Sequence, residues 1–245
     1  MLRKSMRRAI LPVFGLAVLA SGLLGGFRCV AQAPPTIEAE LTRYGVPLTP
    51  ESLHSALTDR RAAVRGLAAS ELAEMRDAAS VPLIAKALEE EKNAQVKFNM
   101  AAALLSFHSA AGAEVLSHVC NDKSEPEGHR LDAASRLVDS GYFQCLSSVL
   151  DILQETTDSS VKGSALLIIA HVKPVPASLI ASVHVALVTS LQDNNSAVRY
   201  DASKCIAAVG DKAAIPNLQA AIANESDEST RKFMKESLTI LEKEP

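Results

Sequence analysis

A pair of residues, the second always basic, recurs along most of this 245-residue chain. Successive pairs are separated by 32, 33, 32, 37 and 32 residues. In the first copy, small Ala68 and Ala69 follow Val64 after four and five positions, and Leu72 follows after eight. Positions 0, 4 and 8 share one face of a helix, so each copy predicts an amphipathic helix, which we call helix B. The six pairs are Val64-Arg65, Val96-Lys97, His129-Arg130, Val161-Lys162, Val198-Arg199 and Thr230-Arg231.

A second apolar stripe ends seven to nine residues before each pair and predicts a second helix per copy, helix A. Pro82 and Pro216 fall at equivalent places, where the first turn of helix A tolerates proline. Thr49 and Pro50 read as the N-cap and first residue of the first A helix. The insertion 173–178 explains the single 37-residue step, and residues 38–44 predict a short helix that caps the array.

A two-helix unit repeated six times predicts an all-α fold, because such units bury their apolar faces only by stacking. The chain resembles the HEAT-repeat family, in particular the short repeats first associated with phycobilisome lyases. The residues that carry this resemblance are Asn195, Val198-Arg199 and Ala202, together with Pro82-Leu83 and Pro216-x-Leu218. The resemblance implies a right-handed α-solenoid. The expected units are a linker and N-terminal cap at 32–49 and repeats at about 50–77, 78–110, 111–141, 142–173, 174–211 and 212–245.

The first 31 residues have the features of a secretory signal peptide. Residues 1–8 contain four basic residues and no acid, and a mostly apolar run follows from 9 to 27. We expect cleavage after Ala31, which leaves Gln32 as the new N-terminus of a periplasmic or secreted protein. The alternative is an uncleaved anchor formed by residues 9–27, the only expected contact with a membrane.

The charge balance argues against nucleic acid as a partner. The whole chain has a net charge of −3, but residues 1–31 hold five basic residues and no acid, so the remainder carries −8. A nucleic-acid binder needs a basic surface to neutralise phosphates.

The remaining cysteines, Cys120, Cys145 and Cys205, are odd in number and match no redox or metal motif. We interpret them as small buried core residues, although an oxidising compartment permits disulfides.

No convergent catalytic set is visible in the sequence. No His-Glu dinucleotide occurs, which disfavours the di-iron hydroxylases among HEAT-like enzymes, and the absence of Trp disfavours base excision. A glycine-rich phosphate loop and a Gly-x-Ser-x-Gly elbow are also missing. We therefore expect no cofactor and no metal. A HEAT-like lyase or oxidoreductase is the alternative.

The basic residues of the repeated pairs form a column that suggests either an anion track or an internal ladder. We favour the ladder, in which each basic side chain binds an acidic or amide group in a neighbouring A–B turn. The carboxylates of residues 89–91 are interpreted as solvated. The column consists of Arg65, Lys97, Arg130, Lys162, Arg199 and Arg231, and its candidate partners are Asp59, Asn93, Asp158, Asp193 and Asp227.

Two positions of helix B, two and three residues after the start of each pair, predict a strip for partner binding. Exposed apolar residues with polar edges are typical of interfaces, but the same side chains would also fit packing against the next B helix. The B helix of the fourth repeat is apolar nearly all round, so Leu167 and Ile168 are additional candidates, including for homo-oligomer contacts. The strip itself comprises Phe98, Asn99, Leu131, Asp132, Tyr200 and Asp201.

Taken together, these features predict an exported, non-enzymatic scaffold or interaction module. Its expected partner is an apolar or basic protein or peptide, because the surface left after the ladder is acidic.

Overall fold

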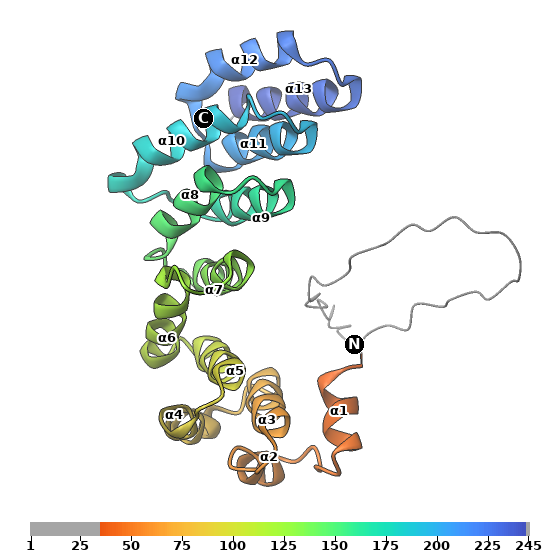
Figure 1. Cartoon of the computed structure of the whole chain (residues 1–245), viewed down its shortest axis with the longest axis vertical. Helices are drawn as coiled ribbons and strands as arrows, with labels where there is room; N and C mark the ends of the chain where they lie inside the picture. Colours follow the sequence, from red (N-terminus) through yellow and green to blue (C-terminus); the bar gives the residue numbers. More distant parts are fainter. Residues whose placement is uncertain (1–34, 244–245) are drawn as a thin grey trace, which may run out of the picture. The chain divides into compact units, whose positions relative to one another are not determined.

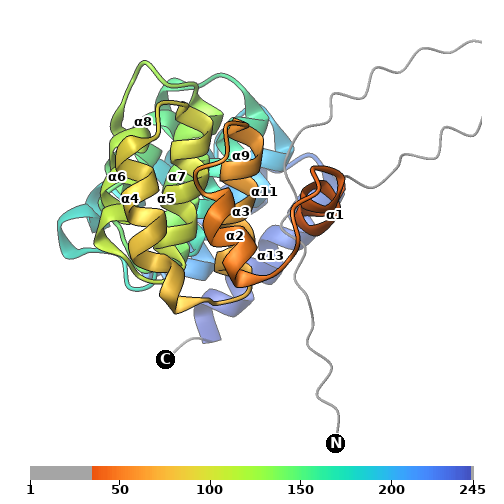
Figure 2. The ribbon, with the colours of Figure 1, turned by 90° about the horizontal axis from the view of Figure 1, so that it is seen from below.

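The structure is a computed structural model that describes residues 35–243, and over that range every regular element is helical. The predicted signal segment at 1–31 lies outside the described residues. A short helix α1 (Ile37–Arg43) comes first, as expected of a capping helix. Six helix pairs follow. In Figure 1 the A helices form one layer and the B helices another, and Figure 2 shows the array from below. This arrangement confirms the all-α repeat architecture.

The A helices are seven to twelve residues long, and the B helices are twelve to sixteen. Among residues 35–243, no helix has the length and hydropathy needed to cross a bilayer. The A layer contains α2 (Pro50–Ala56), α4 (Val81–Glu90), α6 (Ala110–Asn121), α8 (Leu146–Glu155), α10 (Ile180–Ser190) and α12 (Ile215–Asn224). The B layer contains α3 (Ala62–Glu74), α5 (Ala94–Leu105), α7 (Glu127–Asp139), α9 (Ser159–Ala170), α11 (Ser196–Val209) and α13 (Glu228–Lys243).

The helix starts follow the expected capping chemistry. The Thr49 hydroxyl accepts a hydrogen bond from the backbone N–H of Ser52, with Pro50 in the first turn of α2. Pro82 and Pro216 occupy the first turns of α4 and α12. Asn93 caps α5 by the same type of bond, and side chains of the A–B turns also cap α9, α11 and α13, whereas α3 and α7 have no side-chain cap.

The core lies between the two layers. Val64, Ala68 and Leu72 in α3 are completely buried, which confirms that positions 0, 4 and 8 of helix B face inward. The A helix α6 approaches α5 closely at Gly112. A Cβ built at Gly112 would lie 2.5 Å from the backbone oxygen of Ala101.

The cysteines differ in part from the prediction. Cys205 is free and buried, as expected, but Cys120 and Cys145 form a disulfide with a Cα–Cα distance of 6.1 Å. Cys120 lies in the last turn of α6, and Cys145 directly precedes α8. Their sequence separation is 25 residues, so only the stacking of the third and fourth repeats brings them together.

Candidate functional site

Three members of the basic column form ion pairs with an acid of the following repeat. Arg65 Nε lies 2.6 Å from Glu91 Oε2, and Lys162 Nζ lies 2.5 Å from Asp193 Oδ2. Arg199 binds Glu225 through two N–H groups at 2.6 Å each, the bidentate arrangement that suits guanidinium and carboxylate. These three pairs, which we call rungs, make the column an internal ladder over these junctions.

Two of the three acidic partners were missed from the sequence. Glu91 was interpreted as a solvated charge, yet its side chain is 3% exposed, so that interpretation is wrong for this residue. Glu225 was not considered, and its side chain is 1% exposed. Both precede the N-cap of the next B helix by two residues, as Asp193 does, so an alignment of the turns would have revealed them.

The electrostatics of the rungs favour the charged forms. The hydrogen bond from Arg65 lowers the pKa of Glu91 to about 2, although burial acts in the opposite direction. The hydrogen bonds from Arg199 likewise lower the pKa of Glu225. Around Asp193, burial is the largest single influence and raises the pKa, but hydrogen bonds from Lys162 and Asn195 outweigh it and leave the pKa lowered. The rungs therefore remain ion pairs at neutral pH.

The other members of the column do not form rungs within residues 35–243. Lys97 is exposed. Arg130 is buried, and its Nε donates to the backbone oxygen of Cys120 at 3.0 Å. Arg231 donates to the backbone oxygen of Glu225 at 3.3 Å. Of the predicted partners, only Asp193 forms a rung through its side chain. Asn93, Asp158 and Asp227 instead cap helices, and Asp59 binds Arg61 with its side chain while its backbone oxygen accepts from Arg65.

Burial removes part of the predicted partner-binding strip. Phe98, Leu131 and Ile168 are 2%, 4% and 5% exposed, so they belong to the core and offer no surface to a partner. The packing alternative holds for them. The ring of Phe98 lies against His129 of the next B helix, with a centroid distance of 4.7 Å, and the Arg136 guanidinium stacks above it.

The remaining strip residues show how neighbouring B helices interlock. The residue two positions after the start of one repeated pair faces the residue three positions after the start of the next pair. Gly66 faces Asn99, Gly163 faces Asp201, and Tyr200 faces Phe233. Burial raises the pKa of Asp201. Asp132 is exposed and binds Arg136 of its own helix at 3.1 Å. Leu167 is 59% exposed and is the one apolar candidate that projects fully from the B layer within residues 35–243.

The histidines provide helix–helix ties. His54 in α2 contacts Asp77 at 2.6 Å, and His184 in α10 contacts Asp211 at 2.7 Å. Both aspartates lie just before the next A helix, so these two pairs occupy equivalent places. Over the described part of the chain, no group of three or more His, Cys, Asp or Glu side chains is arranged to hold a metal ion. Burial raises the pKa of the Cys205 thiol, which keeps it protonated and weakly nucleophilic.

The outer surface of the last two repeats has an unusual composition. Each of the first four A helices exposes at least one charged side chain, whereas α10 and α12 contain no Asp, Glu, Lys or Arg. Ile180 and Val185 in α10 are 56% and 57% exposed. We call this surface the uncharged face. Its exposed residues are Ile180, Ala181, Ser182, Val185, Thr189, Pro216, Asn217, Gln219, Ala220, Ala223 and Asn224.

A groove of about 540 Å³ adjoins the uncharged face between α10 and α12. Val188 and Leu191 form one side, and Asn217, Ala221 and Asn224 form the other. Arg199 and Asp193 also line the groove, and both belong to rungs. The groove thus presents apolar and carboxamide groups beside charges that are already neutralised within the protein.

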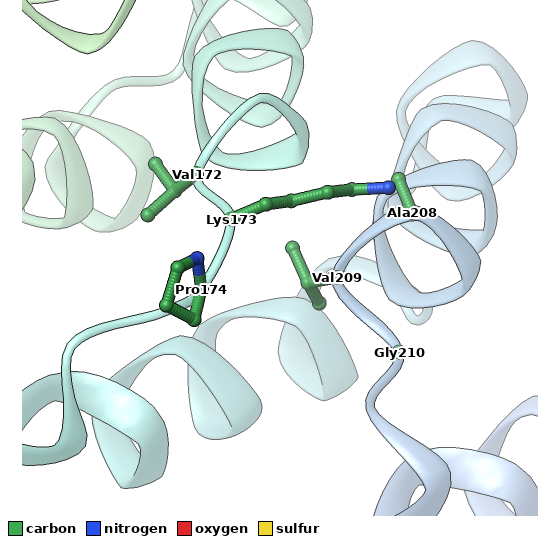
Figure 3. Close-up of a pocket in the computed structure, with 6 residues that line it drawn as sticks. All are labelled: Val172, Lys173, Pro174, Ala208, Val209 and Gly210. Carbon is green, nitrogen blue, oxygen red and sulfur yellow. The ribbon is translucent and has the colours of Figure 1, made fainter. Parts of the chain in front are cut away.

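A second hollow, of about 490 Å³, lies beside the insertion that lengthens the fourth step. Figure 3 shows Lys173 extending across it, with its amino end near Ala208 at the C-terminal end of α11. A lysine at this place complements the partial negative charge of a helix C-terminus. The other lining residues are Val172, Pro174, Val209 and Gly210, so the hollow has no acid–base pair among its walls.

Comparisons with known proteins agree with this architecture. The family model described as HEAT repeats matches residues 50–137 and 146–239. A comparison with curated proteins finds no match. Human deoxyhypusine hydroxylase in complex with glycerol is similar at a TM-score of 0.43 and 17% identity, covering 84% of this chain and 90% of that one. The X-ray structure of YibA of Escherichia coli is similar at a TM-score of 0.40 and 15% identity, covering 87% of this chain and 99% of that one. Likenesses this distant carry no argument about function.

Proposed function

Because the chain belongs to the HEAT-repeat family, whose repeats form a helical module, we propose that it is an exported, non-catalytic protein-interaction module. The observation that carries this proposal is the uncharged face of α10 and α12. Interface cores are depleted of charge, and large exposed apolar side chains often mark binding surfaces. Ile180 and Val185 provide such side chains on a chain that is 22% charged.

The partner that this face fits is a protein segment that is apolar and uncharged. A charged segment would lose hydration against the uncharged face and gain no opposite charge in return. Leu167 offers a second, smaller apolar point on the B layer and serves as the competing location.

Val185→Glu is expected to reduce binding of the partner at least about tenfold, because it places a charge in the centre of an apolar contact. The measurement is affinity capture from a cell-envelope extract with wild-type bait, followed by titration of the captured protein against each variant. Leu83→Glu is the matched control, since Leu83 is 42% exposed on the charged helix α4 and its substitution is expected to leave binding unchanged.

Two results would contradict this location. An equal loss of partner binding with Val185→Glu and with Leu83→Glu would indicate a non-specific hydrophobic contact. A loss of partner binding with Leu167→Glu but not with Val185→Glu would place the binding site on the B layer. If light scattering shows a wild-type dimer that Val185→Glu converts to monomer, the occupant of the uncharged face is a second copy of the chain.

Export is proposed from the basic and apolar pattern of residues 1–31, and the Cys120–Cys145 disulfide supports it. Disulfides persist in oxidising compartments and are rare in the cytosol. We expect protein isolated from the periplasmic or secreted fraction to begin at Gln32 by N-terminal sequencing. Recovery of an intact Met1 in the membrane fraction would instead establish the uncleaved anchor.

A further inference from the structure

The ladder is interrupted at two junctions within residues 35–243. Between the second and third repeats Lys97 is exposed and forms no rung, and between the third and fourth repeats the acid itself is replaced. At three other junctions, an acid two residues before a B-helix N-cap binds the basic residue of the preceding repeat. The corresponding residue before the N-cap Asp158 is Thr156. Its hydroxyl accepts a hydrogen bond from the Asp158 backbone N–H, as the carboxylates of Glu91 and Glu225 do in their own turns. A hydroxyl, however, brings no negative charge to Arg130.

Among residues 35–243, none of the polar contacts across this junction is a buried charge pair. His171 and Asp139 are 3.7 Å apart, and both side chains are more than half exposed. Ser148 donates to Asn121 at 2.6 Å, and Thr156 donates to Glu127 at 3.1 Å. The Lys123–Glu155 pair is 3.8 Å apart, and both side chains are about two-thirds exposed. An exposed pair of this kind contributes little to stability. The junction therefore lacks the buried charge pair that connects the fourth repeat to the fifth.

The disulfide lies at this same junction. It joins the last turn of α6 in the third repeat to the residue before α8 in the fourth, and it encloses the whole of α7. Arg130, the member of the column at this junction, forms no rung and donates to the backbone oxygen of Cys120. The basic side chain that would form the rung thus binds the backbone of a disulfide cysteine.

We propose that the Cys120–Cys145 disulfide replaces the rung that is missing from this junction and that the junction becomes a hinge of the array when the bond is open. The bond prevents α6 and α8 from separating, and rungs oppose the corresponding motion at the three junctions that have them. This inference goes beyond the proposed function and does not depend on the uncharged face.

Formation of the bond balances as a thiol–disulfide exchange. The two thiols lose two electrons and two protons to the disulfide of a thiol oxidoreductase, which leaves as a dithiol. Both cysteines are completely buried in the folded chain. Exchange requires direct attack on sulfur, so the bond closes before the junction packs and is protected from thiols afterwards.

Hydrogen exchange of Cys120→Ala with Cys145→Ala tests the inference. The entropy of a closed loop of this length predicts that opening at the junction becomes about 300-fold more frequent without the cross-link. We expect faster exchange in α6, α7 and the first turn of α8, with α3 and α11 unchanged. Cys205→Ala is the matched control, because it removes a buried thiol outside the junction and is expected to leave the exchange of α6–α8 unchanged.

An unchanged exchange pattern, or an increase spread evenly over α3–α13, would overturn the inference. If the double variant does not fold, wild-type protein is unfolded in urea and reduced with dithiothreitol, which supplies two electrons and two protons and becomes a cyclic disulfide. It is then refolded in the presence of the reductant for the same measurement. Alkylation of denatured wild-type protein without reductant should label Cys205 alone among these three cysteines. Labelling of Cys120 or Cys145 in that experiment would also overturn the inference.

Discussion

Gly112→Ala is expected to destabilise the protein by about 2 kcal/mol, although alanine is normally the better helix residue. The new Cβ would lie 2.5 Å from the Ala101 oxygen and 2.7 Å from the Leu105 nitrogen. Both atoms belong to the backbone of α5, so no side-chain rotation relieves the clash and α6 must move away. The measurement is the shift of the urea unfolding curve followed by circular dichroism.

Gly128→Ala provides the control for this prediction. Gly128 lies in the first turn of α7, and a Cβ there would have no neighbour within 4 Å. Alanine is expected to leave stability unchanged or to raise it by up to about 1 kcal/mol, because it reduces the freedom of the unfolded chain. Equal stability of the two variants would show that α5 and α6 do not approach as closely as the structure describes.

Arg199→Met is expected to cost about 3 kcal/mol in the free energy of unfolding. The substitution keeps most of the apolar stem but leaves the Glu225 carboxylate buried, with its side chain 1% exposed and its guanidinium partner removed. Adding Glu225→Met should recover part of the loss, since an unpaired buried charge costs more than the absence of both groups. Lys123→Met is the control, because its pair with Glu155 is exposed and is expected to contribute under about 0.5 kcal/mol.

The pH dependence distinguishes a lost charge pair from lost packing. The rung lowers the pKa of Glu225 below its usual 4.5, so its stabilisation is complete above that value and fades as the pH falls through the folded pKa. The difference between wild type and Arg199→Met should therefore shrink in acid. A penalty that stays constant between pH 7 and pH 3 would attribute the effect to packing.

The sequence predicted the repeats well because their period is carried by local chemistry. Positions 0, 4 and 8 of helix B, the Thr49 cap and the prolines at 82 and 216 are all confirmed. The ladder was predicted in kind, but two of its three acidic partners were missed, because an acid in a turn is usually solvated. The sequence did not distinguish surface from core for Phe98 and Leu131. Each lies two residues after the start of its repeated pair, so neither shares a helix face with the buried positions 0, 4 and 8.

The sequence by itself determined that this chain forms two-helix units and how many of them stack, because helix period, capping and turn residues act within a few positions. Only the tertiary structure decided which side chains meet between units. Glu91 meets Arg65, Cys145 meets Cys120, and the missing Cβ of Gly112 makes room for α5, over separations of 26 and 25 residues in the first two cases. Such contacts depend on the rise and rotation from one repeat to the next, and no local pattern encodes that geometry.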